Sequence, residues 1–313
     1  MYSSNNAYEI DESGKTFVRL LDKDATEFII PHGVTRIKEN AFFGCSSLKR
    51  VAIPFGVTSI GGEAFNGCSS LRVLVLPASL INIVSAAFWC CSSLSSVDIP
   101  SSVTSIGNSA FYGCSSLKKI EVDENNPEYC SIDGALFTKD QTTLICCPAG
   151  RQNFSIPSSV TSIGRYAFGG CSSLTSVDIP SSVTRIKENA FYGCSSLSSV
   201  VIPPSVTSIG DSAFRNCSSL NSVVIPPSVT SIGDSVFDGC SLLNSVVIPP
   251  NVTSIGYSAF RNCSSLPSLV IPNGVTSIGD GAFDNCPNLI LLVPKGSYAE
   301  KYAKENGIKY ITF

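Results

Sequence analysis

The sequence has 313 residues, of which 43% are hydrophobic and 14% are charged, and its formal net charge is −3. This composition can fill a hydrophobic core but gives the protein no strongly positive electrostatic potential, which argues against binding to the phosphates of a nucleic acid. No apolar run reaches the roughly 18 residues of a membrane span, so we expect no membrane insertion. The start, MYSSNNAYEIDESGK, lacks the basic and apolar stretches of a secretory leader, so the sequence as it stands predicts no export.

The N-terminal segment, residues 1–29, is charged and rich in turn residues, and we expect a hairpin cap there. From residue 30 a 23-residue unit recurs ten times, reading I-P-x-x-V-T-S-I-G-x-x-A-F-x-[GN]-C-S-S-L-x-x-V-x. Such a period is typical of a solenoid, because one repeat alone cannot bury its apolar face whereas stacked neighbours can. We place repeats 1–4 at residues 30–121 and repeats 5–10 at residues 156–293.

Each repeat predicts three local elements. Residues 197–202 are β-branched and stop at a proline, which indicates a short strand, and residues 206–209 form a second extended segment. Residues 211–216 fit one or two turns of helix. The Gly or Asn before the cysteine then indicates a left-handed backbone position. Cys90 breaks this column, so we expect local strain or a reshaped turn there.

The repeated apolar positions predict an interior in which equivalent side chains share a column. The phenylalanines and the cysteines should each form a ladder. A cysteine ladder is either a redox or metal site or a set of small buried hydrophobes, and we favour reduced, buried thiols. No C-x-x-C pair is present and the single histidine is His32, so the ligand spacing of a zinc site is absent. Ten cysteines belong to the column: Cys45, Cys68, Cys91, Cys114, Cys171, Cys194, Cys217, Cys240, Cys263 and Cys286.

Two segments depart from the repeat. Residues 122–155 form an insertion in which two apolar runs flank residues 139–142, a pattern that indicates a hairpin. Its acidic residues do not have calcium-loop spacing, which favours a solvated turn. Residues 294–313 predict a C-terminal cap, with a capping box formed by Ser297 and Glu300, a short helix that ends at Gly307, and a closing strand.

Two groups of variable apolar residues are candidate partner-binding sites. The alternative is that the rings cover the adjacent coil and that the valines reflect strand propensity. The aromatic group lies on or near the expected helical turn and comprises Phe43, Trp89, Tyr112, Tyr166, Tyr192 and Tyr257. The aliphatic group occupies the outward strand position and comprises Val201, Val224, Val247 and Val270, where earlier repeats carry Asp98, Glu121 and Asp178.

The motif I-P-S-S-V-T-S-I-G-x-x-A-F-x-x-C-S-S-L resembles the BspA-type leucine-rich repeats of bacterial surface proteins and of some parasitic protists. The segments D-E-N-N-P-E-Y-C-S-I-D-G-A-L-F-T-K-D and G-S-Y-A-E-K-Y-A-K-E-N-G-I-K-Y are similar to elements of that family, so the likeness extends from about Glu9 to Phe313. The resemblance implies an α/β solenoid, a right-handed superhelix with short parallel strands and short helical turns in each 23-residue coil. It also implies a secreted or surface-exposed adhesion or host-interaction protein that binds matrix proteins, other cells or surface glycans.

We find no pattern typical of an enzyme. His32 is a poor general base, the carboxylates are scattered, and the regular glycines belong to turns rather than to a phosphate loop. We therefore expect a non-enzymatic binding scaffold without a cofactor, with a protein as its partner. An intracellular protein-interaction scaffold and a glycan-binding module are the alternatives. The resemblance places the protein at the cell surface or outside the cell, and a cytoplasmic location is the alternative that the missing leader favours.

Overall fold

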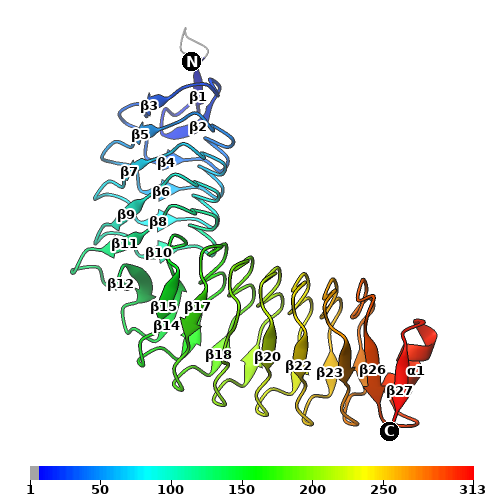
Figure 1. The fold of residues 1–313 in the computed structure, drawn as a ribbon. Coiled ribbons are helices and arrows are strands. Elements are labelled where there is room, and N and C mark those ends of the chain that lie inside the picture. Colours follow the sequence, from blue (N-terminus) through cyan, green and yellow to red (C-terminus); the bar gives the residue numbers. More distant parts are fainter. Residues whose placement is uncertain (1–6) are drawn as a thin grey trace. The chain divides into compact units, whose positions relative to one another are not determined.

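The computed structural model describes residues 7–313, and the first six residues of the expected N-terminal cap lie outside that range. The chain divides into two compact units, the first ending at Gly150 and the second running from Arg151 to Phe313. Within each unit, coils of chain are stacked so that equivalent residues of successive coils lie beside one another (Figure 1). The expected solenoid of parallel-strand coils is therefore confirmed.

Coils contribute one strand to each of two parallel series, with one exception. At residues 197–202 the expected strand is reduced to an isolated parallel bridge between Ser199 and Ser222. In the first unit, one series comprises β3 (Glu27–Ile29), β5 (Arg50–Ala52), β7 (Val73–Val75), β9 (Ser96–Ile99) and β11 (Lys119–Val122). The other series comprises β4 (Arg36–Ile37), β6 (Ser59–Ile60), β8 (Asn82–Ile83) and β10 (Ser105–Ile106). The first series forms the separate sheets β3-β5-β7 and β9-β11, whereas the second is continuous.

The second unit has the same two series, but both are divided into separate sheets. Its first series comprises β15 (Asn153–Ser155), β17 (Ser176–Asp178), β20 (Ser222–Val224), β22 (Ser245–Val247), β24 (Ser268–Val270) and β26 (Ile290–Val293). Its other series comprises β16 (Ser162–Ile163), β18 (Arg185–Ile186), β19 (Ser208–Ile209), β21 (Ser231–Ile232), β23 (Ser254–Ile255) and β25 (Ser277–Ile278). Partners lie 23 residues apart, as in the pair Val224 and Val247, except that β24 and β26 pair residues 22 apart, as in Val270 and Leu292. One outward column is therefore built from one position of the repeat.

Irregular elements occur at the ends and in the insertion. An antiparallel hairpin of β1 (Tyr8–Ile10) and β2 (Thr16–Leu20) joins the first unit's continuous sheet through β4. The insertion holds three antiparallel strands, β12 (Tyr129–Ile132), β13 (Ala135–Thr138) and β14 (Thr143–Cys146). The last coil is followed by α1 (Tyr298–Glu305) and β27 (Tyr310–Thr312). The expected capping box is present only in part. The Ser297 hydroxyl accepts the Glu300 N–H at 3.2 Å, but the Glu300 carboxylate accepts the N–H of Gly296, at 2.6 Å, instead of that of Ser297.

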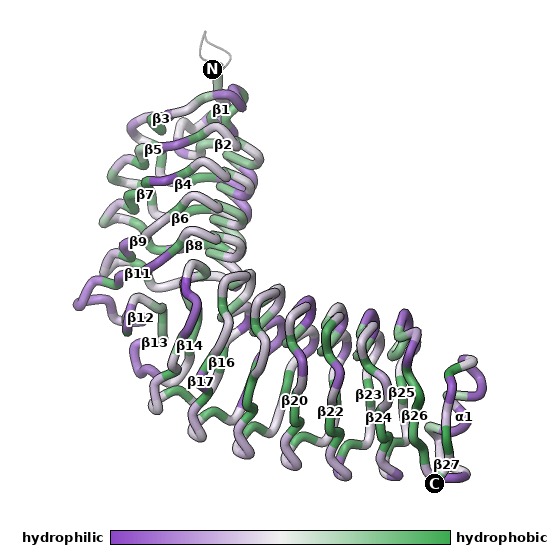
Figure 2. Tube along the Cα trace, in the orientation of Figure 1, coloured by the Kyte–Doolittle hydropathy of each residue, from purple (hydrophilic) through white to green (hydrophobic). Residues whose placement is uncertain are grey.

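A ladder of phenylalanine rings runs through the interior of each unit. In the first unit the ring centres of Phe42 and Phe65 are 4.7 Å apart, and the rings are nearly parallel. In the second unit the centre of Phe214 lies 5.1 Å from that of Phe191 and 5.8 Å from that of Phe237. The rings of these residues are buried, and Figure 2 shows the alternation of hydrophobic and hydrophilic residues along each coil. The sequence-based prediction of a shared interior is confirmed.

The segment around each phenylalanine is a series of turns, so the expected helical turns are wrong. In one repeat the N–H groups of Ala213 and Arg215 donate locally, to the carbonyls three residues earlier. The N–H groups of the alternate residues Ser212, Phe214 and Asn216 instead donate to carbonyls of the next coil, at 2.8, 3.0 and 2.7 Å. In an α-helix, donors beyond the first turn bond to carbonyls four residues earlier in the same segment, whereas here alternate donors bond to the next coil and join the stack.

Left-handed backbone positions make this alternation possible. The Gly or Asn column has positive φ, as expected, from Gly44 at 69° to Asn285 at 57°. A second such column, four residues earlier, holds Ser212 at 56° and was not evident from the sequence because it contains many residue types. Cys90 adopts 57° and its N–H still reaches the Tyr112 carbonyl at 2.7 Å, so the turn is kept and the backbone is strained. The expected strain is confirmed.

Replacing Cys90 with glycine should relieve this strain. We expect Cys90→Gly to raise the free energy of unfolding by about 0.5–1 kcal/mol. The gain is smaller than the full cost of a left-handed conformation for a non-glycine residue, because glycine also increases the conformational entropy of the unfolded chain. Urea denaturation followed by circular dichroism measures it. Gly67→Ala, at φ 75° in the same column, is the matched control and should lower stability by about 1–2 kcal/mol. A destabilised Cys90→Gly protein would contradict the argument.

Candidate binding surfaces

The outward strand positions of the second unit carry an exposed column of valines. Val201, Val224, Val247 and Val270 are 81%, 62%, 53% and 50% exposed. Val224 and Val247 are register partners, and Val270 pairs with Leu292, which in turn pairs with Ile311 of the last strand. Residues before and after each valine are inward or polar. The structure thus pairs Val224 with Val247 and leaves Val201 and Val270 exposed at the equivalent positions of the preceding and following coils; we call these four residues the valine column.

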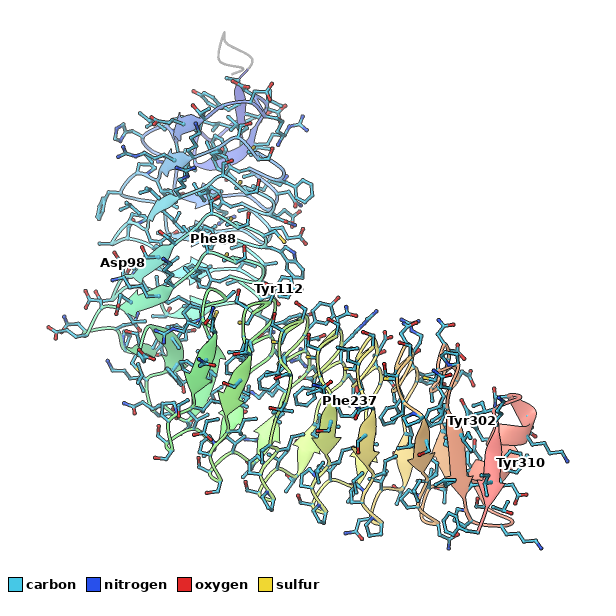
Figure 3. The ribbon with its side chains drawn as sticks, viewed as in Figure 1. Phe88, Asp98, Tyr112, Phe237, Tyr302 and Tyr310 are labelled. Atoms are coloured by element: carbon cyan, nitrogen blue, oxygen red, sulfur yellow. The ribbon has the colours of Figure 1, made fainter. Side chains whose placement is uncertain are left out.

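The equivalent column of the first unit changes character along the stack. Ile29, Ala52 and Val75 are exposed and lie in register on β3, β5 and β7. Asp98 and Glu121 then occupy the same position on β9 and β11 and are directly opposite each other. Figure 3 shows Asp98 on the outer side of its coil, whereas Phe88 lies inside. Charge and apolar surface therefore adjoin on this face.

The candidate aromatic residues do not form a single cluster within either unit. Trp89 and Tyr112 are half-buried, with ring centres 4.3 Å apart, so each covers part of the other. Tyr166 and Tyr192 are half-buried and have ring centres 6.3 Å apart. Two further rings are more exposed and lie away from these pairs in sequence, Phe43 at 50% and Tyr257 at 58%. Ring-on-ring packing between neighbouring coils is thus the main contact of the paired aromatics.

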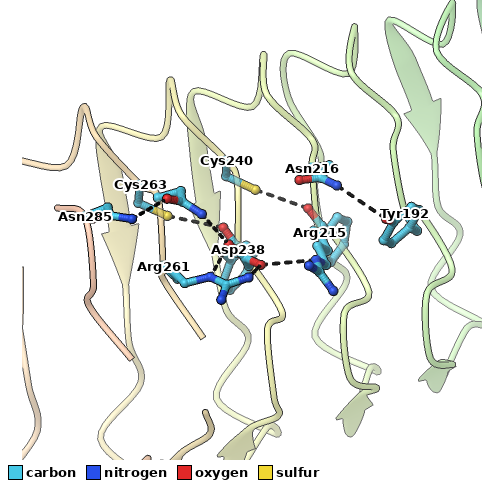
Figure 4. A network of polar contacts seen from close by, with 11 residues as sticks. Tyr192, Arg215, Asn216, Asp238, Cys240, Arg261, Cys263 and Asn285 are labelled. Atoms are coloured by element: carbon cyan, nitrogen blue, oxygen red, sulfur yellow. Dashed lines mark hydrogen bonds and ion pairs between the residues drawn. The ribbon is translucent and has the colours of Figure 1, made fainter. Parts of the chain in front are cut away.

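A charged network that the sequence analysis missed follows the same column as Tyr192 (Figure 4). Asp238 is only 2% exposed, and both of its oxygens accept hydrogen bonds from Arg261, at 3.1 and 2.8 Å. Arg215 approaches the same carboxylate to 3.1 Å without forming a hydrogen bond through Nε, and its guanidinium lies 5.9 Å from the Tyr192 ring centre. The Asp238 contact raises the pKa of Arg261.

The signal for this network was available in the sequence. The residue after each repeat phenylalanine reads Tyr192, Arg215, Asp238, Arg261 and Asp284, which alternates in charge once the coils are stacked. Because stacking places these residues beside one another, opposite charges 23 residues apart become neighbours, as i and i+4 residues do on a helix. The network joins neighbouring coils through Asp238, which contacts both Arg215 and Arg261.

The thiol column is buried and chemically quiet. All fourteen cysteines, which lie within residues 7–313, are thiols rather than disulfides, as expected. Column thiols donate to the phenylalanine carbonyl of the preceding coil, as Cys68 does to Phe42 at 3.2 Å. Burial raises the pKa of Cys68 to about 12 and that of Cys286 to about 11. Thiolates, the reactive form, are therefore suppressed at neutral pH.

The threonine of the V-T-S-I segment recurs in successive coils and forms a column of hydroxyls, which is also used within the stack. The threonine of one coil donates to the carbonyl of the equivalent threonine before it, as Thr207 does to Thr184 at 3.3 Å and Thr184 to Thr161 at 3.2 Å. A hydroxyl that donates to the backbone retains only acceptor sites for an outside ligand. This array is consequently a structural feature of the repeat.

The described residues show no arrangement typical of a catalytic or metal centre. Residues 7–313 contain no group of three or more His, Cys, Asp or Glu side chains close enough to hold a metal ion. The one helix of this range, α1, is neither long nor apolar enough to cross a membrane. The surface features that remain are the valine column, the aromatic pairs and the charged edge of the first unit.

Removing the carboxylate at the centre of the network should destabilise the second unit. We expect Asp238→Ala to lower the free energy of unfolding by about 2–3 kcal/mol, because Arg215 and Arg261 would lose their shared counter-charge. Urea denaturation measures the change. Asp284→Ala alters the same column without this shared partner and should stay within about 0.5 kcal/mol of the parent. Equal losses in the two variants would show that the shared carboxylate has no special role.

Alkaline conditions should destabilise the protein through the buried thiols. An unfolded thiol ionises at about pH 9, whereas folded Cys68 keeps its proton up to about pH 12. Between these values the folded chain binds more protons, so stability is complete below pH 9 and falls as the pH rises, by about 1.4 kcal/mol per pH unit for each thiol. Denaturation midpoints from pH 8 to about pH 10.5 measure the slope. Cys68→Ala should reduce that slope by one thiol's share, and an unchanged slope would refute the assignment.

Comparison with known proteins agrees with this fold. Six copies of the family model described as the BspA type leucine rich repeat region match residues 20–142, 147–266 and 232–299. A leucine-rich repeat protein from Eubacterium ventriosum has a similar structure, with 28% identity, coverage of 87% of this chain and 88% of that chain, and a TM-score of 0.68. A leucine rich cell surface protein from Faecalibacterium prausnitzii has 26% identity, 96% coverage of both chains and a TM-score of 0.59.

A third similar structure is a leucine-rich repeat protein from Bacteroides ovatus, with 27% identity, coverage of 96% of this chain and 87% of that chain, and a TM-score of 0.52. None of the curated proteins matches this chain. The family match spans far more than half of the sequence and agrees with the stacked coils, the phenylalanine ladder and the parallel strands. The chain therefore belongs to the BspA-type leucine-rich repeat family.

Proposed function

We propose that this protein is a non-enzymatic scaffold that binds another protein through the outward strand face of its second unit. The observation that carries the proposal is the valine column, four consecutive outward valines that are each at least half exposed. Exposed apolar side chains in a continuous row mark interaction sites more often than scattered ones do. Neighbouring coils fix the spacing of these valines before any partner arrives.

The energetics of the valine column fit a specific contact. Covering one exposed valine contributes about 1 kcal/mol, so the four together supply several kcal/mol before polar contacts are added. Little is lost to ordering, because the side chains are branched and the strands are hydrogen-bonded to their neighbours. Serines at the other outward strand position, such as Ser222 and Ser245, provide a polar border.

A cell-surface location, with an adhesive role, belongs to the same proposal. It is supported by family membership and by the similarity to the Faecalibacterium protein, which is described as a cell surface protein. The intracellular alternative is supported by the fourteen thiols, since cysteines outside the cell usually form disulfides. Burial of the thiol column protects it from oxidants and reconciles it with an extracellular site.

A glycan-binding role would use the aromatic residues instead. Sugar rings stack on exposed aromatic faces, and in this structure Trp89 and Tyr112 turn part of their faces toward each other. The threonine hydroxyls donate to backbone carbonyls of neighbouring coils. These contacts favour a protein partner over a glycan.

The valine column can be tested with isosteric variants. We expect Val224→Thr combined with Val247→Thr to weaken capture of extracellular-matrix proteins from an immobilised panel by about tenfold, which is about 1.4 kcal/mol. Threonine keeps the β-branched shape, so thermal stability should be unchanged. Surface plasmon resonance measures capture, and a glycan array run in parallel tests the alternative.

The matched control is Val84→Thr, an exposed valine outside the column, which should capture the same proteins as the parent. The proposal fails if the parent captures no protein of the panel, or if the double variant captures its protein as well as the parent does. Binding confined to the glycan array, and reduced by Trp89→Ala, would replace the proposal with the glycan-binding role.

A further inference from the structure

An apolar groove with an acidic rim lies on the outward face of the first unit. Its volume is about 440 Å³, and it opens where the sheet β3-β5-β7 ends and the sheet β9-β11 begins. The residues that form it come from β7, β9, β11 and the turns that follow them. This groove is separate from the valine column, which belongs to the second unit.

Part of the groove lining, which we call its floor, is apolar. Leu74, Leu76 and Ile99 line it with their outer parts while remaining buried in the coil. Val75 stands at the edge and is exposed. A ligand seated in the groove would cover Val75 and complete the packing around the floor, which is the usual source of affinity in such a site.

The rest of the groove lining includes carboxylates that repel one another. Asp98 and Glu121 are register partners on adjacent strands, and like charges directly opposite in a sheet are destabilising. Within residues 7–313 Asp98 has no ion-pair partner, and Glu121 has only Lys119, with the charged atoms 3.6 Å apart. Asp123 adds a third carboxylate at the end of β11. A bound cation would relieve this repulsion.

Hydrogen bonds hold the acidic rim in place. The N–H of Asp123 donates to the Ile99 carbonyl at 3.0 Å, which joins the rim to the preceding coil. Three residues further on, the buried Asn126 donates to the carbonyls of Pro100 and Val103 at 2.8 and 2.9 Å. The carboxylates are therefore presented on a fixed backbone, so a ligand would lose little free energy in ordering them.

We infer that this groove binds an extended polypeptide segment in which a lysine or arginine is flanked by apolar residues. An extended chain presents alternate side chains to opposite sides, so apolar groups reach the floor while a cation meets Asp98 and Glu121. One helical turn with side chains would by itself fill about the whole volume of the groove. The inference rests on the proposed protein-binding function but concerns a different surface.

A short synthetic peptide is a direct probe. We expect the full protein to bind fluorescein-labelled Val-Lys-Val-Arg-Val in fluorescence anisotropy, and to bind Val-Ser-Val-Ser-Val about tenfold more weakly. Raising NaCl from about 50 mM to about 300 mM should lower the affinity for the basic peptide and leave the affinity for the serine peptide nearly unchanged. Asp98→Asn with Glu121→Gln should lower affinity for the basic peptide by about tenfold and abolish its salt dependence.

The matched control is Asp178→Asn, which removes a carboxylate at the same outward position in the second unit and should leave peptide binding intact. Four results would overturn the inference: no binding of the basic peptide, equal binding of the serine peptide, unchanged binding by the double amide variant, or displacement of the peptide by about 1 mM CaCl₂. The Val224→Thr and Val247→Thr variant should bind this peptide normally, so failure at the groove is distinguishable from failure at the valine column.

Discussion

Hydrogen bonds from one coil to the next are the constraint on which the rest of the structure depends. Around each phenylalanine, alternate N–H groups leave their own segment, and Phe214 for example donates to Val236 of the following coil. The remaining donors close local turns. This division is incompatible with a helix, and it requires left-handed positions such as Ser212 and Asn216 at regular intervals. When these bonds between coils are formed, the strands, phenylalanine rings and thiols of successive coils are aligned.

Strict alignment of coils converts sequence variation into surface columns. Positions that face inward are repeated, because each must fit the same neighbours above and below. Outward positions are free to change, and a residue substituted at one of them contacts the equivalent residue of the adjacent coil, about 23 positions away. The same rule yields an apolar row at Val224 and Val247, a compensated ion network at Asp238, and opposed carboxylates at Asp98 and Glu121.

These columns differ in what they leave for a partner. The network at Asp238 is complete, because two arginines meet one buried carboxylate. The valines present apolar surface to solvent, and the pair Asp98 and Glu121 presents two opposed carboxylates, of which only Glu121 has an ion-pair partner, Lys119, among the described residues. A scaffold whose interior is uniform can thus carry separate recognition features along its length, each on a backbone that is already ordered.

The sequence by itself determined the period, the parallel stacking, the buried columns and the outward position of the valines, because all of these follow from one apolar pattern repeated every 23 residues. It also indicated strain at Cys90, since only Gly and Asn take the left-handed position cheaply. The tertiary structure decided between turns and helix at residues 211–216, because that choice depends on whether backbone donors bond within a coil or between coils. It likewise decided which side chains meet, as Arg261 does with Asp238, since contacts across the stack join residues that local propensity treats as unrelated.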